Sequence, residues 1–186
     1  MNIEESDLQK LLEAIDNKKL SIPEAIALIN GKMENNKPLQ STDDIKLTVD
    51  YTKTVDQAIA DGKYGWKNSD ITAKHFPISP EMIGTKVEIS GKLFHFNRSM
   101  SSEDVIKEMD KDGYRPAVLM EALALAAAYP ELQRRFPIIA LGSVWRVSFG
   151  NRRVPCLLVD GYDRKLFLYY FGNTWVAQVR FFGIRK

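Results

Sequence analysis

This chain of 186 residues is poor in the residues that build disulfides and metal sites. It has one cysteine, Cys156, and two histidines, His75 and His95. A single cysteine excludes an internal disulfide, which indicates a reducing compartment, so we expect a cytoplasmic location. Because paired cysteines and H-x-x-x-H motifs are absent, we expect no metal site. Cys156 lies in an apolar stretch, and we expect its thiol to be buried and inert.

Glycine-rich phosphate loops and long apolar runs are also absent. Neither G-x-G-x-x-G nor a Walker loop occurs, so the sequence predicts no nucleotide cofactor and no other cofactor. No apolar run approaches the roughly 18 residues that a membrane span needs. The first residues, MNIEESDLQKLLEAID, are acidic and amphipathic, and they lack the apolar core of a signal peptide. We therefore expect no association with a membrane. A hydrophobic fraction of 45% and a charged fraction of 27% are typical of a globular protein.

Arginine is missing from the first half of the chain. Residues 1–91 hold 11 Lys, no Arg and 15 Asp or Glu, a net charge of −4, whereas residues 92–186 hold 5 Lys, 10 Arg and 9 Asp or Glu, a net charge of +6. Within 133–186, ten basic residues are opposed only by Asp160 and Asp163, which leaves a net charge of +8. Two interpretations are open: the arginines brace a sheet by pairing with the acidic first half, or they bind an anionic ligand or partner.

Apolar spacing and turn residues divide the chain into three parts. Residues 1–36 carry two helical repeats, one after Ser6 and one after Pro23, which predict an N-terminal helical hairpin. Residues 37–91 begin with a polar linker and continue as a mixed segment of strand and loop. Residues 92–186 combine helical and strand patterns, and we expect them to form an α+β domain.

Within these parts, three local patterns are distinct. Alternating apolar residues predict a strand over 45–51, and Thr54 is a candidate N-cap for the short helix that follows it. Two further helices are predicted within 103–129. We expect Ser101 or Ser102 to cap the first of them and Pro116 to begin the second.

Strand patterns dominate the last 50 residues. Four strand-like runs are separated by the turn dipeptides Gly150-Asn151, Asp160-Gly161 and Gly172-Asn173. This spacing predicts that 141–184 forms an antiparallel meander of four consecutive strands. We expect the two helices of 103–129 to cover one face of that sheet. Because helices and strands are segregated, the fold class is α+β and not a parallel βαβ fold.

Three motifs follow one another in the second half of the chain. Gly113–Ala117 (GYRPA) opens a Leu- and Glu-containing helix, Gly142–Trp145 (GSVW) begins a tryptophan strand, and Val179–Arg185 (VRFFGIR) closes the domain. This order over 92–186 resembles bacterial domains of the C-type-lectin-like superfold. The resemblance implies a lectin-like α+β domain with a binding surface on its C-terminal sheet. It implies no activity, because the cysteine pair of formylglycine-generating enzymes and a set of calcium ligands are both missing.

Arginines and aromatic residues alternate around the predicted hairpins, where they could stack on bases or sugars. The alternative is that about half of these aromatic residues belong to the core. Arg152 and Arg153 are consecutive in a strand, so we expect them to face opposite sides of the sheet. At least one of them should be exposed or paired with an acid of the first half, because an unpaired buried charge is costly. The candidate ligand-binding residues are Trp145, Arg146, Arg152, Arg153, Tyr170, Asn173 and Trp175.

These observations predict a non-enzymatic binding or interaction protein whose partner is a protein or a small anionic ligand. We assign no catalytic residue, because no catalytic constellation is evident. One alternative is an anion-binding protein for nucleotides or nucleic acid that uses the arginine-rich C-terminal sheet. A second alternative is an enzyme with a site near His95 and Arg98. The sequence leaves the ligand and the oligomeric state open.

Overall fold

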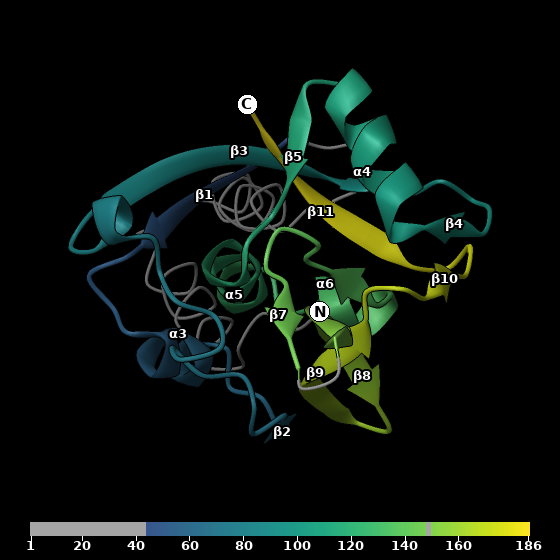
Figure 1. Cartoon of the computed structure of the whole chain (residues 1–186). Helices are drawn as coiled ribbons and strands as arrows, with labels where there is room; N and C mark the ends of the chain where they lie inside the picture. Colours follow the sequence, from purple (N-terminus) through teal and green to yellow (C-terminus); the bar gives the residue numbers. More distant parts are fainter. Residues whose placement is uncertain (1–43, 148–149) are drawn as a thin grey trace, which may run out of the picture. The chain divides into compact units, whose positions relative to one another are not determined.

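The computed structural model of this chain describes residues 44–147 and 150–186 (Figure 1). The helical hairpin that the sequence predicts at 1–36 lies outside the described residues. Residues 40–186 belong to one structural unit. Its helices and single 3-10 turn are α3 (Val55–Asp61), η1 (Pro80–Met82), α4 (Ser102–Lys111), α5 (Leu119–Ala128) and α6 (Leu132–Arg135).

Most strands of this unit join one large sheet. The strands are β1 (Ile45–Asp50), β2 (Trp66–Lys67), β3 (Lys86–Phe94), β4 (Met100–Ser101), β5 (Tyr114–Pro116), β6 (Ile138–Ile139), β7 (Trp145–Arg146), β8 (Arg152–Asp160), β9 (Asp163–Tyr170), β10 (Thr174–Trp175) and β11 (Arg180–Arg185). The sheet has the order β1-β3-β11-β6-β8-β9-β2, with β5 beside β11 and β7 beside β8. Strands β4 and β10 form a separate pair. The predicted α+β class is confirmed.

Helix α5 lies inside the curve of this sheet. Figure 1 shows α5 nearly end-on, with β1 and β3 on one side of it and β8 and β9 on the other. The run LMEALALAAA has no polar face, as expected for a helix that is buried over most of its surface, and only Ala127 and Ala128 at its C-terminal end are exposed. Each fully buried leucine of this helix stabilises the fold by about 1.5–3 kcal/mol relative to an exposed position. The buried residues of α5 are Leu119, Met120, Glu121, Ala122, Leu123, Leu125 and Ala126.

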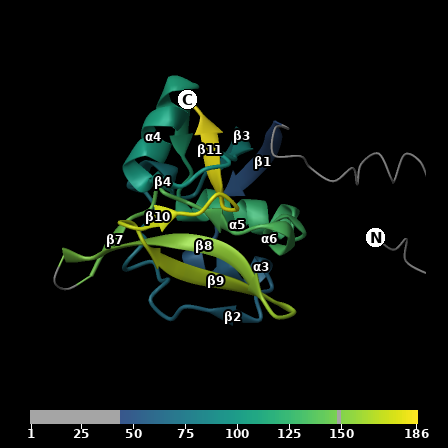
Figure 2. The same ribbon diagram turned by 90° about the vertical axis from the view of Figure 1, so that its right-hand side faces the viewer.

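The expectation that both helices of 103–129 cover one face of the sheet is wrong. Val105 and Met109 of α4 share a buried cluster with Cys156 and Phe181, which point to one face. Arg164 projects from the other face and reaches the main chain of α5. Figure 2 shows α4 beyond β4 and β10, on the side away from the β8–β9 hairpin. The two helices therefore pack on opposite faces, because the sheet is apolar on both sides in its middle strands. The predicted burial of Cys156 is confirmed.

The predicted meander is confirmed for three strands and wrong for the fourth. Strand β8 pairs antiparallel with both β7 and β9, as the turn residues predict. Strand β11, by contrast, pairs antiparallel with β3 and β5 and parallel with β6. Its closely spaced buried residues explain the change. Phe181 and Phe182 lie on opposite faces and are both buried, which requires a central position in the sheet and not an edge beside β9.

Pro116 does not begin a helix, contrary to the sequence prediction. It ends β5, where Pro116 lies opposite Gly183 of β11. Proline fits a short flanking strand because such a strand does not need every N–H group in a ladder. The helix begins at Leu119, two residues after Ala117, whose N–H donates to the Phe182 carbonyl at 2.9 Å.

The capping predictions for the other two helices are confirmed. The Thr54 hydroxyl accepts from the Gln57 N–H, and the Gln57 side chain accepts from the Thr54 N–H, which completes a capping box. The Ser101 hydroxyl accepts from the Asp104 N–H at 3.1 Å and caps α4. The predicted strand over 45–51 is β1, with every second residue buried.

A buried guanidinium joins the ends of two helices to the sheet. Arg164 of β9 donates to the Gly62 carbonyl at 2.7 Å and to the Ala126 carbonyl at 2.6 Å. These carbonyls lie at the C-terminal ends of α3 and α5, where the helix dipole favours a cation. A third bond goes to Gln133 Oε1 at 2.9 Å. Since these partners are neutral, burial lowers the pKa of Arg164, and its charge is stabilised by helix dipoles and not by a carboxylate.

We expect Arg164→Met to lower the free energy of unfolding by about 3–5 kcal/mol, because two helix ends and an amide lose their buried donor. Urea unfolding followed by circular dichroism measures this loss. Arg98→Met is the matched control, since Arg98 is exposed, and its effect should stay below about 0.5 kcal/mol. Equal effects of the two substitutions would contradict this role for Arg164.

Candidate functional site

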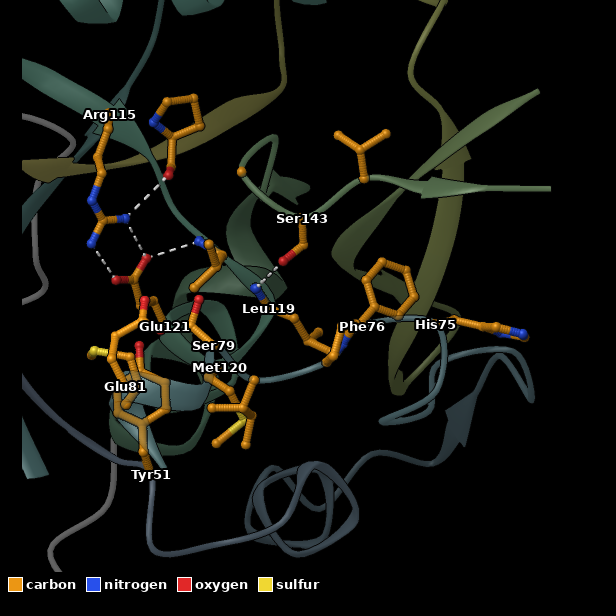
Figure 3. A pocket seen from close by; sticks show the side chains of 17 residues that line it. Tyr51, His75, Phe76, Ser79, Glu81, Arg115, Leu119, Met120, Glu121 and Ser143 are labelled. Carbon is orange, nitrogen blue, oxygen red and sulfur yellow. Dashed lines mark hydrogen bonds and ion pairs between the residues drawn. The ribbon is translucent and has the colours of Figure 1, made fainter. Parts of the chain in front are cut away.

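A cleft of about 590 Å³ lies at the N-terminal end of α5. Three segments that are far apart in the sequence form its walls: residues 75–82, residues 115–121 and residues 142–144. Tyr51, which follows β1, adds a fourth side (Figure 3). The apolar part of the lining consists of Phe76, Pro77, Ile78, Met82, Pro116, Val118, Leu119, Met120 and Val144.

Gly142 brings two of these segments together. A Cβ atom at this position would lie 2.5 Å from the Pro116 carbonyl oxygen and 2.7 Å from the Ala117 carbonyl oxygen. The Gly142 N–H donates to the same Ala117 carbonyl at 2.9 Å. Only glycine permits this approach of two backbones without displacing one of them. The close contact places Ser143 against the first turn of α5.

A buried ion pair forms the polar end of the cleft. Arg115 Nη1 donates to Glu121 Oε2 at 2.9 Å, and Nη2 donates to Oε1 at 2.6 Å. Glu121 is 1% exposed, and its Oε2 also accepts from the Val118 N–H at 2.8 Å. Hydrogen bonding to this carboxylate raises the pKa of Arg115. Glu121 thus neutralises Arg115 and caps α5 at the same time.

Three hydrogen-bonding groups at this end retain free capacity. The Arg115 side chain is 43% exposed, and its Nε forms no hydrogen bond within the described residues. Figure 3 shows the Tyr51 hydroxyl pointing toward the Arg115–Glu121 pair. The Ser143 hydroxyl accepts from the Leu119 N–H at 2.8 Å, so its own proton can be donated elsewhere. These donors and the apolar lining make the cleft amphipathic.

His75 lies at the rim of the cleft and stacks on Trp145. Their ring centroids are 4.1 Å apart, with an angle of 13° between the planes. The His75 Nδ1 is 2.8 Å from the Asp70 carbonyl oxygen. Because a carbonyl oxygen only accepts, Nδ1 carries the proton of this bond. Trp145 lies opposite Arg153 in the β7–β8 pair, and Arg153 lies opposite Tyr170 in the β8–β9 pair.

The structure brings three of the seven predicted ligand-binding residues onto one face. They are Trp145, Arg153 and Tyr170, and the Arg153 guanidinium carbon lies 3.6 Å from the centre of the Tyr170 ring. Arg152 points to the other face, as the alternation of a strand requires. It pairs with Glu103 at 2.9 Å and covers the ring of Phe171. The acid that pairs with Arg152 therefore lies in the second half of the chain and not in the acidic first half.

The remaining three predicted residues lie apart from this face. Arg146 is exposed and lies opposite Arg152 in β7–β8. Asn173 is half-buried in the turn that precedes β10. Trp175 is 5% exposed, and its Nε1 donates to the Ser102 hydroxyl at 2.8 Å. Trp175 thus belongs to the core, which is the alternative that the sequence left open for half of the aromatic residues.

The surroundings of His95 contain no cluster of ionisable groups. His95 is exposed, and its Nε2 is 3.0 Å from the Ala177 carbonyl oxygen. Arg98 is also exposed, and no ion pair is formed by it in the described part of the chain. Within residues 44–147 and 150–186, no group of three or more His, Cys, Asp or Glu side chains is placed to hold a metal ion.

Comparison of this chain with protein-family models, with curated proteins and with solved structures finds no match. The resemblance to C-type-lectin-like domains therefore stays a prediction. Among the described residues, no helix is long and apolar enough to cross a membrane.

Sequence reasoning missed the residues of the cleft. Arg115 and Pro116 were noticed only as parts of a motif, and Tyr51 and Ser143 were assigned no role. One signal was present: Glu121 is the single charged residue in the apolar run of α5. A charge in a fully buried helix needs a partner, and Arg115 is an arginine six residues earlier.

Burial in the cleft and, to a smaller extent, the nearby Glu121 carboxylate raise the pKa of Tyr51 to about 12, although the Arg115 guanidinium opposes this shift. The unfolded chain releases this proton near pH 10. Stability should therefore fall as the pH rises from 10 to 12, because the unfolded state then binds fewer protons. Between pH 9 and pH 11.5, we expect Tyr51→Phe to remove about 1–2 kcal/mol of that loss. Chemical unfolding at pH 9 and at pH 11.5 measures it, and Tyr162→Phe, at an exposed tyrosine, is the control. An identical fall in both variants would contradict the buried position of Tyr51.

Proposed function

We propose that this chain is a binding protein, and not an enzyme, whose cleft takes a small ligand with an apolar body and a hydrogen-bond acceptor at one end. The observation that carries the proposal is that Arg115, Tyr51 and Ser143, which all retain free donors, line one mainly apolar cleft. Ligand sites have this composition, with few polar groups that fix the orientation of an otherwise apolar molecule.

The state of the ionisable groups supports binding over catalysis. Both oxygens of Glu121 accept hydrogen bonds, which stabilises the carboxylate and leaves it a poor general base. The high pKa of Tyr51 keeps its phenol protonated at neutral pH. The Nδ1 of His75 is occupied by a main-chain carbonyl. Glu81 and Ser79 also line the cleft, but no hydrogen bond joins a carboxylate or imidazole to a hydroxyl among its described residues.

The ion pair also favours a neutral acceptor over a carboxylate. Glu121 compensates the charge of Arg115, so the pair offers N–H groups without a net positive charge. A ligand carboxylate would lie near the Glu121 carboxylate and be repelled by it. An amide or ketone oxygen meets no such repulsion, and we therefore propose a neutral ligand. We also propose a reducing compartment such as the cytoplasm, because the sequence holds a single cysteine and therefore no internal disulfide.

N-acetylphenylalaninamide tests this proposal, with N-acetylphenylalanine as its charged counterpart. We expect the amide to shift the amide resonances of Leu119 and Ser143 in NMR titrations and to bind more tightly than the acid. Tyr51→Phe should weaken binding by about 2–10-fold, the value of one hydrogen bond. Tyr162→Phe serves as the control, because Tyr162 is 96% exposed and lines no part of the cleft. Equal binding of acid and amide, or no effect of Tyr51→Phe, would refute the proposal.

A second candidate is binding of a nucleic acid by the arginines of the C-terminal sheet. The observation that favours it is that Arg153 and, on the other side of the β7–β8 pair, Arg146 form no ion pair with any described residue, whereas Arg152 pairs with Glu103. Trp145 and Tyr170 flank Arg153 and offer partly exposed rings for stacking.

We expect the double variant Arg146→Gln/Arg153→Gln to lose retention on immobilised polyuridylate, while thermal stability stays within a few degrees. Arg98→Gln removes one positive charge elsewhere and should retain binding. Binding that depends on phosphate contacts should also fall steeply between 50 and 200 mM salt, by about tenfold or more for two or more contacts. Retention that is unchanged in the double variant would exclude this surface as the nucleic-acid site.

A further inference from the structure

Strand β1 leaves one edge of the large sheet open. It begins the strand order and pairs only with β3 among the described residues. The Tyr51 N–H donates to the Thr85 carbonyl at 2.9 Å, so Tyr51 directs its N–H toward the β3 side. Since this direction alternates along an antiparallel strand, Lys46 and Thr48 present their N–H and C=O groups to the open edge, as does the N–H of Asp50, whose carbonyl accepts from the Lys53 N–H at 3.4 Å. An open edge is a template for a further strand.

A groove of about 450 Å³ runs along this edge. All five residues from Lys46 to Asp50 line one wall. Ala58 and Asp61 of α3 contribute to the opposite wall. The floor is formed by α5 and the residue that follows it, through Met120, Leu123, Ala124, Ala127, Ala128 and Tyr129. The groove is distinct from the cleft described above, and Met120 lies between the two.

The shape of the groove fits a single extended segment. Because α3 forms the second wall, the sheet of another molecule would meet α3 on approaching β1, whereas a single extended segment is narrower than a sheet. In such a strand, every second side chain points toward α5. The floor of the groove contains Ala124, Ala127 and Ala128 of α5, and their small side chains leave space for apolar side chains of the bound segment.

The charged residues along this edge indicate which side chains a bound segment would carry. Asp50 pairs with Lys86 at 3.2 Å, and Lys53 pairs with Asp61 at 2.7 Å. Lys46 is exposed and forms no ion pair with any described residue. The uncompensated charge on this edge is therefore positive, and an acidic side chain directly opposite Lys46 would complement it.

We propose that this groove binds an extended segment of a partner protein, which adds to β1 as an antiparallel strand. The segment places an acidic residue opposite Lys46 and apolar residues at alternate positions over α5. Main-chain hydrogen bonds supply affinity in this mode of recognition, and the alternate side chains supply specificity. The inference does not rest on the function proposed for the cleft, because the two sites have different walls.

The blocked pentapeptide acetyl-Lys-Val-Thr-Val-Glu-amide is the probe. Paired antiparallel with β1, it sets its glutamate opposite Lys46, its threonine opposite Thr48 and its lysine opposite Asp50. Its two valines then point toward α5. We expect a dissociation constant of about 10–100 μM by calorimetry, with NMR shifts of the Lys46, Thr48 and Asp50 amides.

Two N-methylated peptides form a matched pair. In the proposed register, the N–H of the central threonine donates to β1, and the N–H of the first valine points away. Methylation of the threonine nitrogen should weaken binding at least about tenfold, and methylation of the valine nitrogen should change it less than about threefold. Absence of binding of the parent peptide at 1 mM, or equal effects of both methyl groups, would overturn the proposal.

A variant of the chain tests the groove itself. Ala127 is an exposed residue of α5 that lines the groove, so Ala127→Leu should fill it and abolish peptide binding. Ala60→Leu is the control, because Ala60 is an exposed helical residue of α3 outside the lining. Full binding by Ala127→Leu would overturn the proposal. Self-association that Ala127→Leu disrupts would also overturn it, because the occupant would then be a second copy of this chain.

Discussion

The burial of helix α5 inside a curved sheet is the constraint from which the other features of this protein follow. A buried helix must satisfy the free N–H groups of its first turn and the free C=O groups of its last turn without water. At the N-terminal end, the Val118 N–H bonds to Glu121 and the Leu119 N–H bonds to Ser143. At the C-terminal end, Arg164 donates to the Ala126 carbonyl. Each end is closed by a side chain that reaches it from the helix itself or from a neighbouring segment.

The two ends of α5 differ in how accessible they are from solvent, and this difference explains why the cleft lies at the N-terminal end. Arg164 is 8% exposed and is enclosed by α3, α5 and Gln133, so no room remains beside it for a ligand. The ion pair of Arg115 and Glu121 lies at the mouth formed by three loops and keeps free donors. At the N-terminal end, the side chains that cap the helix therefore also line the cleft, where the proposed ligand would bind. Along the side of the helix, alanines in place of larger residues leave the groove next to β1.

The arginines of the second half divide into internal and surface groups. Arg164 lies inside and donates to helix carbonyls, whereas Arg115 pairs with the buried Glu121 and is itself partly exposed in the cleft. Arg152 pairs with Glu103, also within the second half. One arginine does pair with an acid of the first half. Arg185, the last residue of β11, lies 3.4 Å from Asp44. Compensation of the positive charge is therefore local in most of these cases, and Arg146 and Arg153 of β7–β8 form no ion pair with any described residue.

The α+β class, the caps at Thr54 and Ser101 and the β7–β8–β9 hairpins could be predicted from the sequence, because each depends on residues within a few positions of one another. The place of β11 between β3 and β6 could not, since strand pairing over more than 80 residues leaves no local pattern. The residues around Trp175 in the sequence do not distinguish it from an exposed aromatic residue, yet the packing of α4 buries its side chain. The cleft was also beyond prediction, because Tyr51, Arg115 and Ser143 are far apart in the chain. Only the packing of β1, β5 and the 142–144 segment around the first turn of α5 places them in one cleft.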